Sequence, residues 1–118
     1  MINGMRSKLA AVAALAALVS SVACASAPER LSIEDRTITV FNDSGEAWNG
    51  VEIWVNDHYR VTRDTIAHGE RFIVPVETFT AGFGQRFDAA QAVSGIEVTA
   101  TDASGDPVRL TWGTGRRR

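Results

Sequence analysis

The sequence is poor in the residues on which many small secreted or nucleic-acid-binding proteins depend. Its 118 residues include one cysteine, Cys24, which excludes an internal disulfide framework. Lys8 is the only lysine, and the formal net charge of -2 gives no basic surface for a nucleic acid. The longest apolar run, Leu9–Val19, has eleven residues. It is too short to cross a bilayer as a helix, which takes about 20 residues.

The N-terminal segment has the three parts of a secretory signal peptide. Arg6 and Lys8 precede the apolar run, and a zone of small residues follows it. We therefore expect residues 1–23 to be a signal peptide that is removed from the mature chain. Met1 and Met5 both remain open as the start, because the residues between them add nothing to this pattern.

Cys24 stands at the end of this segment, in a motif of its own. The stretch Ser21–Cys24 resembles a bacterial lipobox, although Ser21 occupies a position where the pattern prefers an aliphatic residue. The resemblance implies cleavage before Cys24, a diacylglycerol group on its sulfur and an acylated amino terminus. Several acyl chains on one residue satisfy the requirement for stable membrane anchoring. The alternative is cleavage after Ala25, which would discard Cys24 and release a soluble secreted protein.

These features predict both a domain plan and a location. We expect a signal peptide at 1–23, a lipid-anchored tether at 24–36, a folded domain at 37–113 and a disordered basic tail at 114–118. Removing the signal peptide takes away two positive charges and no acid, so the net charge falls from -2 to -4. The expected location is the cell envelope, at the outer membrane or periplasmic face, with secretion as the alternative.

The rest of the chain alternates apolar and polar residues in short runs separated by turn-forming residues, which is typical of β-strands. The first two runs, 37–42 and 51–56, predict a β-hairpin whose core face carries Ile38, Val40, Ile53 and Val55. Asn49-Gly50 is interpreted as a tight turn before the second run, and 56–58 as a turn after it. Pro75 lacks a ladder donor, so its strand is expected at a sheet edge or to end there. The expected strands are 37–42, 51–56, 59–62, 72–76, 96–100 and 108–112, with a possible strand start near 31–33.

This pattern predicts an all-β fold, a small antiparallel β-sandwich of about six or seven strands. The stretch from Val40 to Val76 contains an Asn-x-Ser-Gly loop at 42–45, an alternating strand at 51–55 and an Ile-Ala-His-Gly-Glu turn at 66–70. In this order they resemble the small immunoglobulin-like domains of bacterial envelope proteins. The resemblance implies the sandwich fold and the envelope location, and it carries no catalytic residues.

The sequence offers little catalytic or metal-binding chemistry. His58 and His68 fall in predicted turns, without the cysteine or carboxylate spacing of a metal site. The serine-hydrolase motif Gly-x-Ser-x-Gly is absent. We therefore predict no enzyme, no metal and no cofactor. The alternative is a small hydrolase that uses the histidines with acids such as Glu52, Asp64 and Glu97.

Three aromatic residues of the expected hairpin indicate a binding surface. If Val40 pairs with Ile53, then Phe41 becomes the diagonal neighbour of Trp54 on the face away from the core. Trp48 in the adjoining loop would extend this surface, and exposed tryptophan is a favoured contact residue.

The prediction is a non-catalytic envelope lipoprotein, an accessory or binding module that contacts another envelope component. It would use this aromatic face or a sheet edge, and its partner could be an envelope protein or a glycan. The membrane would be contacted through the lipid on Cys24. The alternatives are a small secreted hydrolase or carbohydrate-binding protein, and a covered face in which the loop at 79–87 packs over the aromatic residues.

Overall fold

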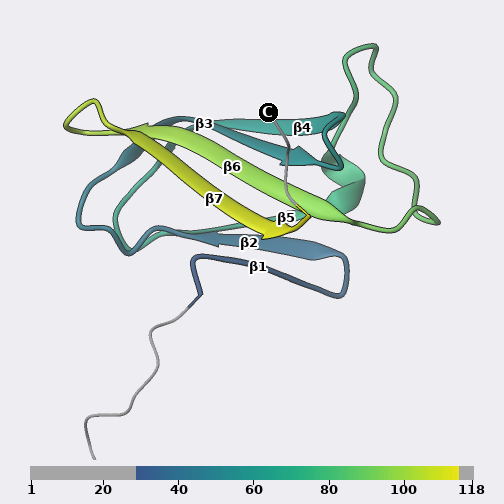
Figure 1. Ribbon diagram of the computed structural model, residues 1–118, viewed down its shortest axis with the longest axis horizontal. Coiled ribbons are helices and arrows are strands. Elements are labelled where there is room, and N and C mark those ends of the chain that lie inside the picture. Colours follow the sequence, from purple (N-terminus) through teal and green to yellow (C-terminus); the bar gives the residue numbers. More distant parts are fainter. Residues whose placement is uncertain (1–28, 115–118) are drawn as a thin grey trace, which may run out of the picture.

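The computed structural model describes residues 29–114, which fold into seven strands and one short 3-10 helix (Figure 1). Within this range no helix is long and apolar enough to cross a membrane. The signal peptide, Cys24 and the arginines at 116–118 lie outside the described residues. The elements are β1 (Leu31–Glu34), β2 (Thr37–Phe41), β3 (Trp48–Val55), β4 (Tyr59–Ile66), β5 (Arg71–Pro75), η2 (Val76–Thr78), β6 (Gly95–Asp102) and β7 (Pro107–Gly113).

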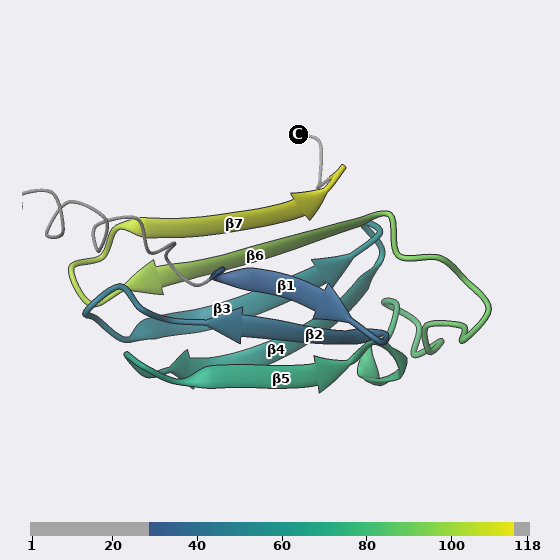
Figure 2. The ribbon, with the colours of Figure 1, turned by 90° about the horizontal axis from the view of Figure 1, so that it is seen from below.

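The strands form two antiparallel sheets packed face to face (Figure 2). The three-stranded sheet has the order β1-β2-β5, and the four-stranded sheet has the order β4-β3-β6-β7. This confirms the predicted all-β sandwich. β5 is an edge strand that ends at Pro75, as expected, and β6 pairs with β7 as a hairpin. The sandwich already includes β1, so the folded domain begins inside the segment predicted to be the tether.

The core is built from the alternate residues of each strand, as the sequence pattern predicted. Ile38 and Val40 of β2 and Ile53 and Val55 of β3 are fully buried. The phenylalanines of the long segment after β5 divide between core and surface, because Phe79 and Phe87 are buried whereas Phe83 is 83% exposed. The other buried apolar residues are Leu31, Trp48, Val51, Ile66, Val74, Val76, Ile96, Val98 and Ala100.

The predicted hairpin between β2 and β3 is wrong. β2 pairs with β1 and β5, whereas β3 pairs with β4 and β6, so the two strands lie in different sheets. The segment 42–47, called the arch from here on, carries the chain from one sheet to the other. β2 instead pairs with the strand before it and β3 with the strand after it. The first pair is joined by the two-residue turn Asp35-Arg36 and the second by the three-residue loop 56–58, in which Asn56 and Asp57, like Asp35 and Arg36, have positive φ. Such turns match the twist of the strands they join.

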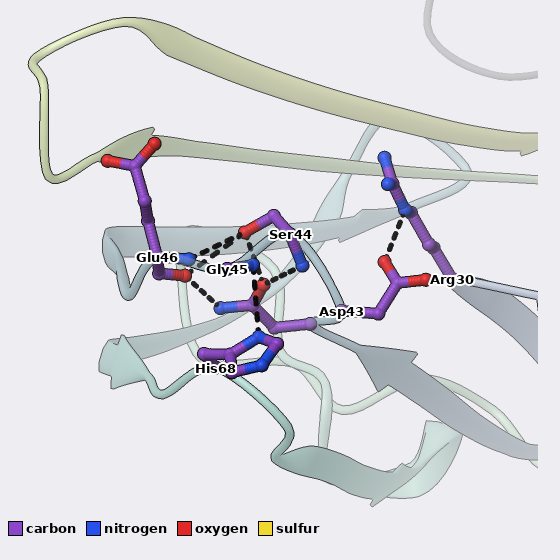
Figure 3. A network of polar contacts seen from close by, with 7 residues as sticks. Arg30, Asp43, Ser44, Gly45, Glu46 and His68 are labelled. Carbon is purple, nitrogen blue, oxygen red and sulfur yellow. Dashed lines mark hydrogen bonds and ion pairs between the residues drawn. The ribbon is translucent and has the colours of Figure 1, made fainter.

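Asn42 holds the arch in place, with its side chain fully buried. Its Nδ2 donates to the carbonyl oxygens of Glu46 at 2.7 Å and Ile66 at 2.9 Å. Its Oδ1 accepts from Ser44 N at 3.1 Å and from Ser44 Oγ at 2.7 Å. Figure 3 shows the part of this network around Ser44 and Glu46, together with the bond that the Gly45 N–H donates to His68 Nδ1 at 3.0 Å. Asn42 therefore bonds to Ser44 and Glu46 within the arch and to Ile66 at the end of β4, so it ties the arch to the four-stranded sheet.

Asn49-Gly50 is also not a turn. Both residues lie inside β3, and the register with β6 shifts between Asn49 and Glu52. Gly50 has φ of 60°, the conformation that glycine supplies at a β-bulge. The pairing with β4 is unbroken over the same residues. Asn49-Gly50 correctly indicated a residue with positive φ, but that residue lies in a bulge within a strand and not in a turn.

Candidate functional site

The outer face of the four-stranded sheet presents one large aromatic side chain, Trp54 of β3. Its neighbours in the strand, Ile53 and Val55, point into the core, so alternation places Trp54 on the opposite face. The register puts Arg60 of β4 on one side of Trp54 and Glu97 of β6 on the other. Trp54 is thus a half-buried aromatic residue in a row of charged side chains.

Polar contacts fix the position of Trp54. Its Nε1 donates a hydrogen bond of 3.1 Å to Glu52 Oε1, two residues earlier in the same strand. The guanidinium carbon of Arg60 lies 5.3 Å from the centre of the Trp54 ring, within cation–π range. Arg60 Nη1 also lies 3.9 Å from Glu52 Oε2. Because three side chains hold one another, the indole is oriented before any ligand arrives.

Glu97 is the buried member of this face, with only 6% of its surface exposed. It forms an ion pair with Arg109 of β7, whose Nε donates to Glu97 Oε2. A buried carboxylate is tolerated when it is paired and hydrogen-bonded in this way. Glu97 therefore has a structural partner on the sheet.

The segment Phe79–Phe87, called the finger from here on, folds as a small hairpin beside this face. Phe87 N donates to Phe79 O at 2.9 Å, and Ala81 N donates to Gln85 O at 2.8 Å. Gly84, with φ of 87°, sits in the turn, and Phe83 beside it is exposed. The finger thus buries the two phenylalanines of its base and presents the third at its tip. Figure 1 shows the segment that contains it projecting beyond the end of the sandwich.

The finger is joined to the edge of the four-stranded sheet. Arg60 N donates to Thr80 O at 2.9 Å, and Thr80 N donates to Arg60 O at 3.3 Å. Below this pair, the rings of Tyr59 and Phe87 meet edge to face with their centres 4.9 Å apart. Thr80 therefore acts as a one-residue extension of the sheet next to β4, and the finger has a fixed docking point.

Arg36 fastens the rest of the long segment that carries the finger. Its Nη1 donates to Gln91 O at 3.0 Å and its Nη2 to Asp88 O at 3.1 Å. Its guanidinium carbon lies 5.7 Å from the centre of the Phe87 ring. Backbone bonding adds to this, because Val76 N donates to Arg36 O at 3.0 Å. One arginine in the turn between β1 and β2 thus links the three-stranded sheet to the base of the finger.

Between the finger and the outer face lies a hollow of about 500 Å³. One wall is the sheet, which contributes an aromatic ring, a guanidinium and a threonine hydroxyl. The other wall is the finger, where glycine positions leave the backbone accessible. The lining residues are Trp54, His58, Arg60, Thr62, Thr80, Ala81, Gly82 and Gly84. The volume is within the range typical of small-molecule sites.

The structure does not bring the three predicted binding residues together. Phe41 lies on the outer face of the three-stranded sheet, where the guanidinium carbon of Arg71 is 4.0 Å from its ring centre. It is therefore on the opposite side of the sandwich from Trp54, and the predicted contact between them is wrong. Trp48 is the first residue of β3 and is 1% exposed, so it belongs to the core. Its Nε1 has no hydrogen-bond partner within residues 29–114.

The sequence analysis did not identify the finger as a wall of a site. Gly82 and Gly84 disfavour a helix, and the segment forms none, but these glycines carry no information about the strand edge on which the segment docks. Thr62 and Thr80 had no motif to mark them. Their common position appears only once the register places Arg60 between Trp54 and Thr80.

The two histidines lie at opposite ends of β4. His58 precedes the strand and lines the hollow, whereas His68 follows it and accepts the hydrogen bond from the arch. An eight-residue strand spans roughly 26 Å at 3.3 Å per residue, so the pair cannot act in one catalytic centre. Among the described residues there is also no group of three or more histidine, cysteine or acidic side chains that could hold a metal ion.

Comparison with known proteins gives no relative: no family model, no curated protein and no solved structure matches this chain. The function of this chain is therefore inferred from its sequence and from the geometry of the hollow.

Proposed function

We propose that this protein is a non-catalytic binding module of the bacterial cell envelope and that it holds its partner in the hollow between Trp54 and the finger. The observation that carries the proposal is the hollow itself. It pairs a pre-oriented aromatic ring with a nearby guanidinium, free hydroxyls and accessible backbone. Binding sites combine apolar surface with a few placed polar groups in this way. Aromatic and arginine side chains also dominate the energetics of many interfaces.

The proposal keeps Trp54 from the sequence prediction and replaces its neighbours. Phe41 is left out of the site because it lies on the outer face of the other sheet, and Trp48 is left out because it lies in the core. Thr80 and the glycines of the finger take their place as the second wall. Phe83, 83% exposed, lies between the lining residues Gly82 and Gly84 at the tip of the finger and offers an apolar contact there.

The envelope location and the lipid anchor are part of the proposal and rest on the sequence. The signal-peptide pattern supports export, and the lipobox-like stretch ending at Cys24 supports acylation. The mature chain then needs only a folded domain and a short tether to present its binding surface at a membrane. A sandwich that starts at Leu31 leaves six residues between Cys24 and the first strand.

The test is photo-crosslinking in living cells with a reactive amino acid placed at Phe83 or, as the matched control, at Ile73. Both side chains are exposed, at 83% and 59%, but Ile73 lies on the other sheet. We expect an adduct from position 83 and none from position 73.

The same experiment in a Trp54→Ala background should remove the position-83 adduct. In a Phe41→Ala background, which truncates the aromatic residue of the opposite face, the adduct should persist. Adducts from position 73 alone, or a position-83 adduct that survives Trp54→Ala, would show that the hollow is not the binding surface. Far-UV circular dichroism of each purified variant shows that it is folded.

A further inference from the structure

We infer that the ligand of the hollow is a saccharide, bound with one sugar ring stacked on Trp54. This inference rests on the proposed function and specifies the chemical class of the partner. It is carried by three features of the hollow: the aromatic platform, the hydroxyl and amide groups around it, and the occupied strand edge beside it.

The platform is suited to a ring with an apolar face and a polar rim. A sugar ring presents C–H groups on its faces and hydroxyl groups at its edge, so it matches an aromatic surface surrounded by hydrogen-bonding groups. Trp54 sits on a sheet face and its orientation is set by the hydrogen bond to Glu52. Little side-chain freedom is then lost on binding, which is the advantage of a pre-organised site.

The groups around the platform fit hydroxyl ligands. Arg60 offers guanidinium donors, and the hydroxyls of Thr62 and Thr80 can each donate and accept. Neither threonine hydroxyl makes a hydrogen bond within residues 29–114. Gly82 and Gly84 are exposed and have no side chain of their own to cover the backbone, although the Gly84 N–H already donates to Ala81 O.

The surroundings argue against the two other ligand classes. An extended peptide would bind by adding a strand to β4, but at Arg60 that edge is already paired with Thr80. An apolar ligand would need apolar walls, and Trp54 and Ala81 are the only apolar side chains among the lining residues. A polar, ring-shaped ligand satisfies both constraints.

The experiment is a titration of the purified mature protein, labelled with ¹⁵N, with four soluble tetrasaccharides followed by NMR. The probes are N-acetylglucosamine tetramer, cellotetraose, maltotetraose and tetragalacturonate, each taken to 10 mM. We expect at least one probe to shift the Trp54 indole signal and the amide signals of Thr80, Gly82 and Gly84. The amides of β2, on the opposite sheet, should stay in place.

Two variants and two matched controls decide whether the binding uses the hollow. Trp54→Ala should weaken the affinity at least tenfold, and Thr80→Val, which removes a hydroxyl without changing the shape, should weaken it several-fold. Phe41→Ala and Thr39→Val make the same changes on the outer face of the other sheet and should alter the affinity less than twofold. Circular dichroism shows whether each variant is folded.

The outcomes separate this inference from the proposed function. If no probe shifts any signal while the Phe83 crosslink persists and depends on Trp54, the saccharide inference is wrong and the binding module stands. If a probe binds but Trp54→Ala and Thr80→Val leave its affinity unchanged, the inference is also wrong. If both the probe shifts and the crosslink are absent, the hollow is not a binding site and the two proposals fall together.

Discussion

Asn42→Ala should be among the most destabilising single changes in this domain. The substitution removes four hydrogen bonds at a fully buried position. It leaves the Ile66 carbonyl without its side-chain donor, which costs about 1 to 3 kcal/mol for a buried group. The lost bonds to Ser44 and Glu46 add roughly 0.5 to 1 kcal/mol each. The Ser44 hydroxyl can still donate to Glu46 O, at 3.1 Å, so part of the arch is retained.

The expected total is about 3 kcal/mol. For a domain of this size each kcal/mol lowers the melting temperature by about 4–8 °C, so a fall of about 12–24 °C is expected. Urea unfolding followed by tryptophan fluorescence measures the free energy directly, because Trp48 is buried in the core and becomes exposed when the core opens.

Asn49→Ala is the matched control. Asn49 is exposed and its Oδ1 accepts a single 3.0 Å bond, from Thr65 Oγ1. Its loss should cost no more than about 0.5 kcal/mol. If Asn42→Ala and Asn49→Ala lower the free energy of unfolding equally, the arch is held by its backbone and packing, and the reasoning from the Asn42 network is wrong.

Two further predictions concern the support of the finger and the attachment of the chain. In Arg36→Lys, the single ammonium cannot reach both the Asp88 and Gln91 carbonyls. Hydrogen–deuterium exchange should therefore speed up in the segment 79–93 while the amides of β3 stay protected. Unchanged exchange in the segment would contradict the role assigned to Arg36. Radiolabelled palmitate should enter the wild-type protein and be absent from Cys24→Ser; equal labelling of both, or of neither, would reject the lipid anchor.

Alternation identified the buried residues of the strands but not the strands that lie beside them. Ile38, Val40, Ile53 and Val55 were correctly assigned to the core. The same residues would be buried in either arrangement: a hairpin turns both apolar faces to the same side of one sheet, and an arch turns them toward each other across the core. Alternation of apolar and polar residues does not indicate whether two consecutive strands lie in the same sheet. The error in the contact between Phe41 and Trp54 follows from this single ambiguity.

The residues of the two tight turns could have shown that β2 pairs with β1 and that β3 pairs with β4. Asn56-Asp57 was recognised as a turn, but Asp35-Arg36 was assigned to the tether, although both pairs adopt positive φ in tight turns. Arginine is not a residue that suggests such a turn. Arg36 adopts positive φ, which a non-glycine residue disfavours, and its side chain bonds to the segment after β5. Such long-range contacts leave no local trace in the sequence.

If Cys24 carries a lipid, the position of Leu31 limits how far the hollow can be from the membrane. β1 begins at the arch end of the sandwich and runs toward the Asp35-Arg36 turn, the end at which the finger projects. Seven residue steps separate Cys24 from Leu31 and span at most about 24 Å when extended. An eight-residue strand adds roughly 26 Å. A lipid on Cys24 would therefore confine the hollow to a layer about 50 Å deep above the anchoring leaflet, and a ligand beyond that depth would be out of reach at any affinity.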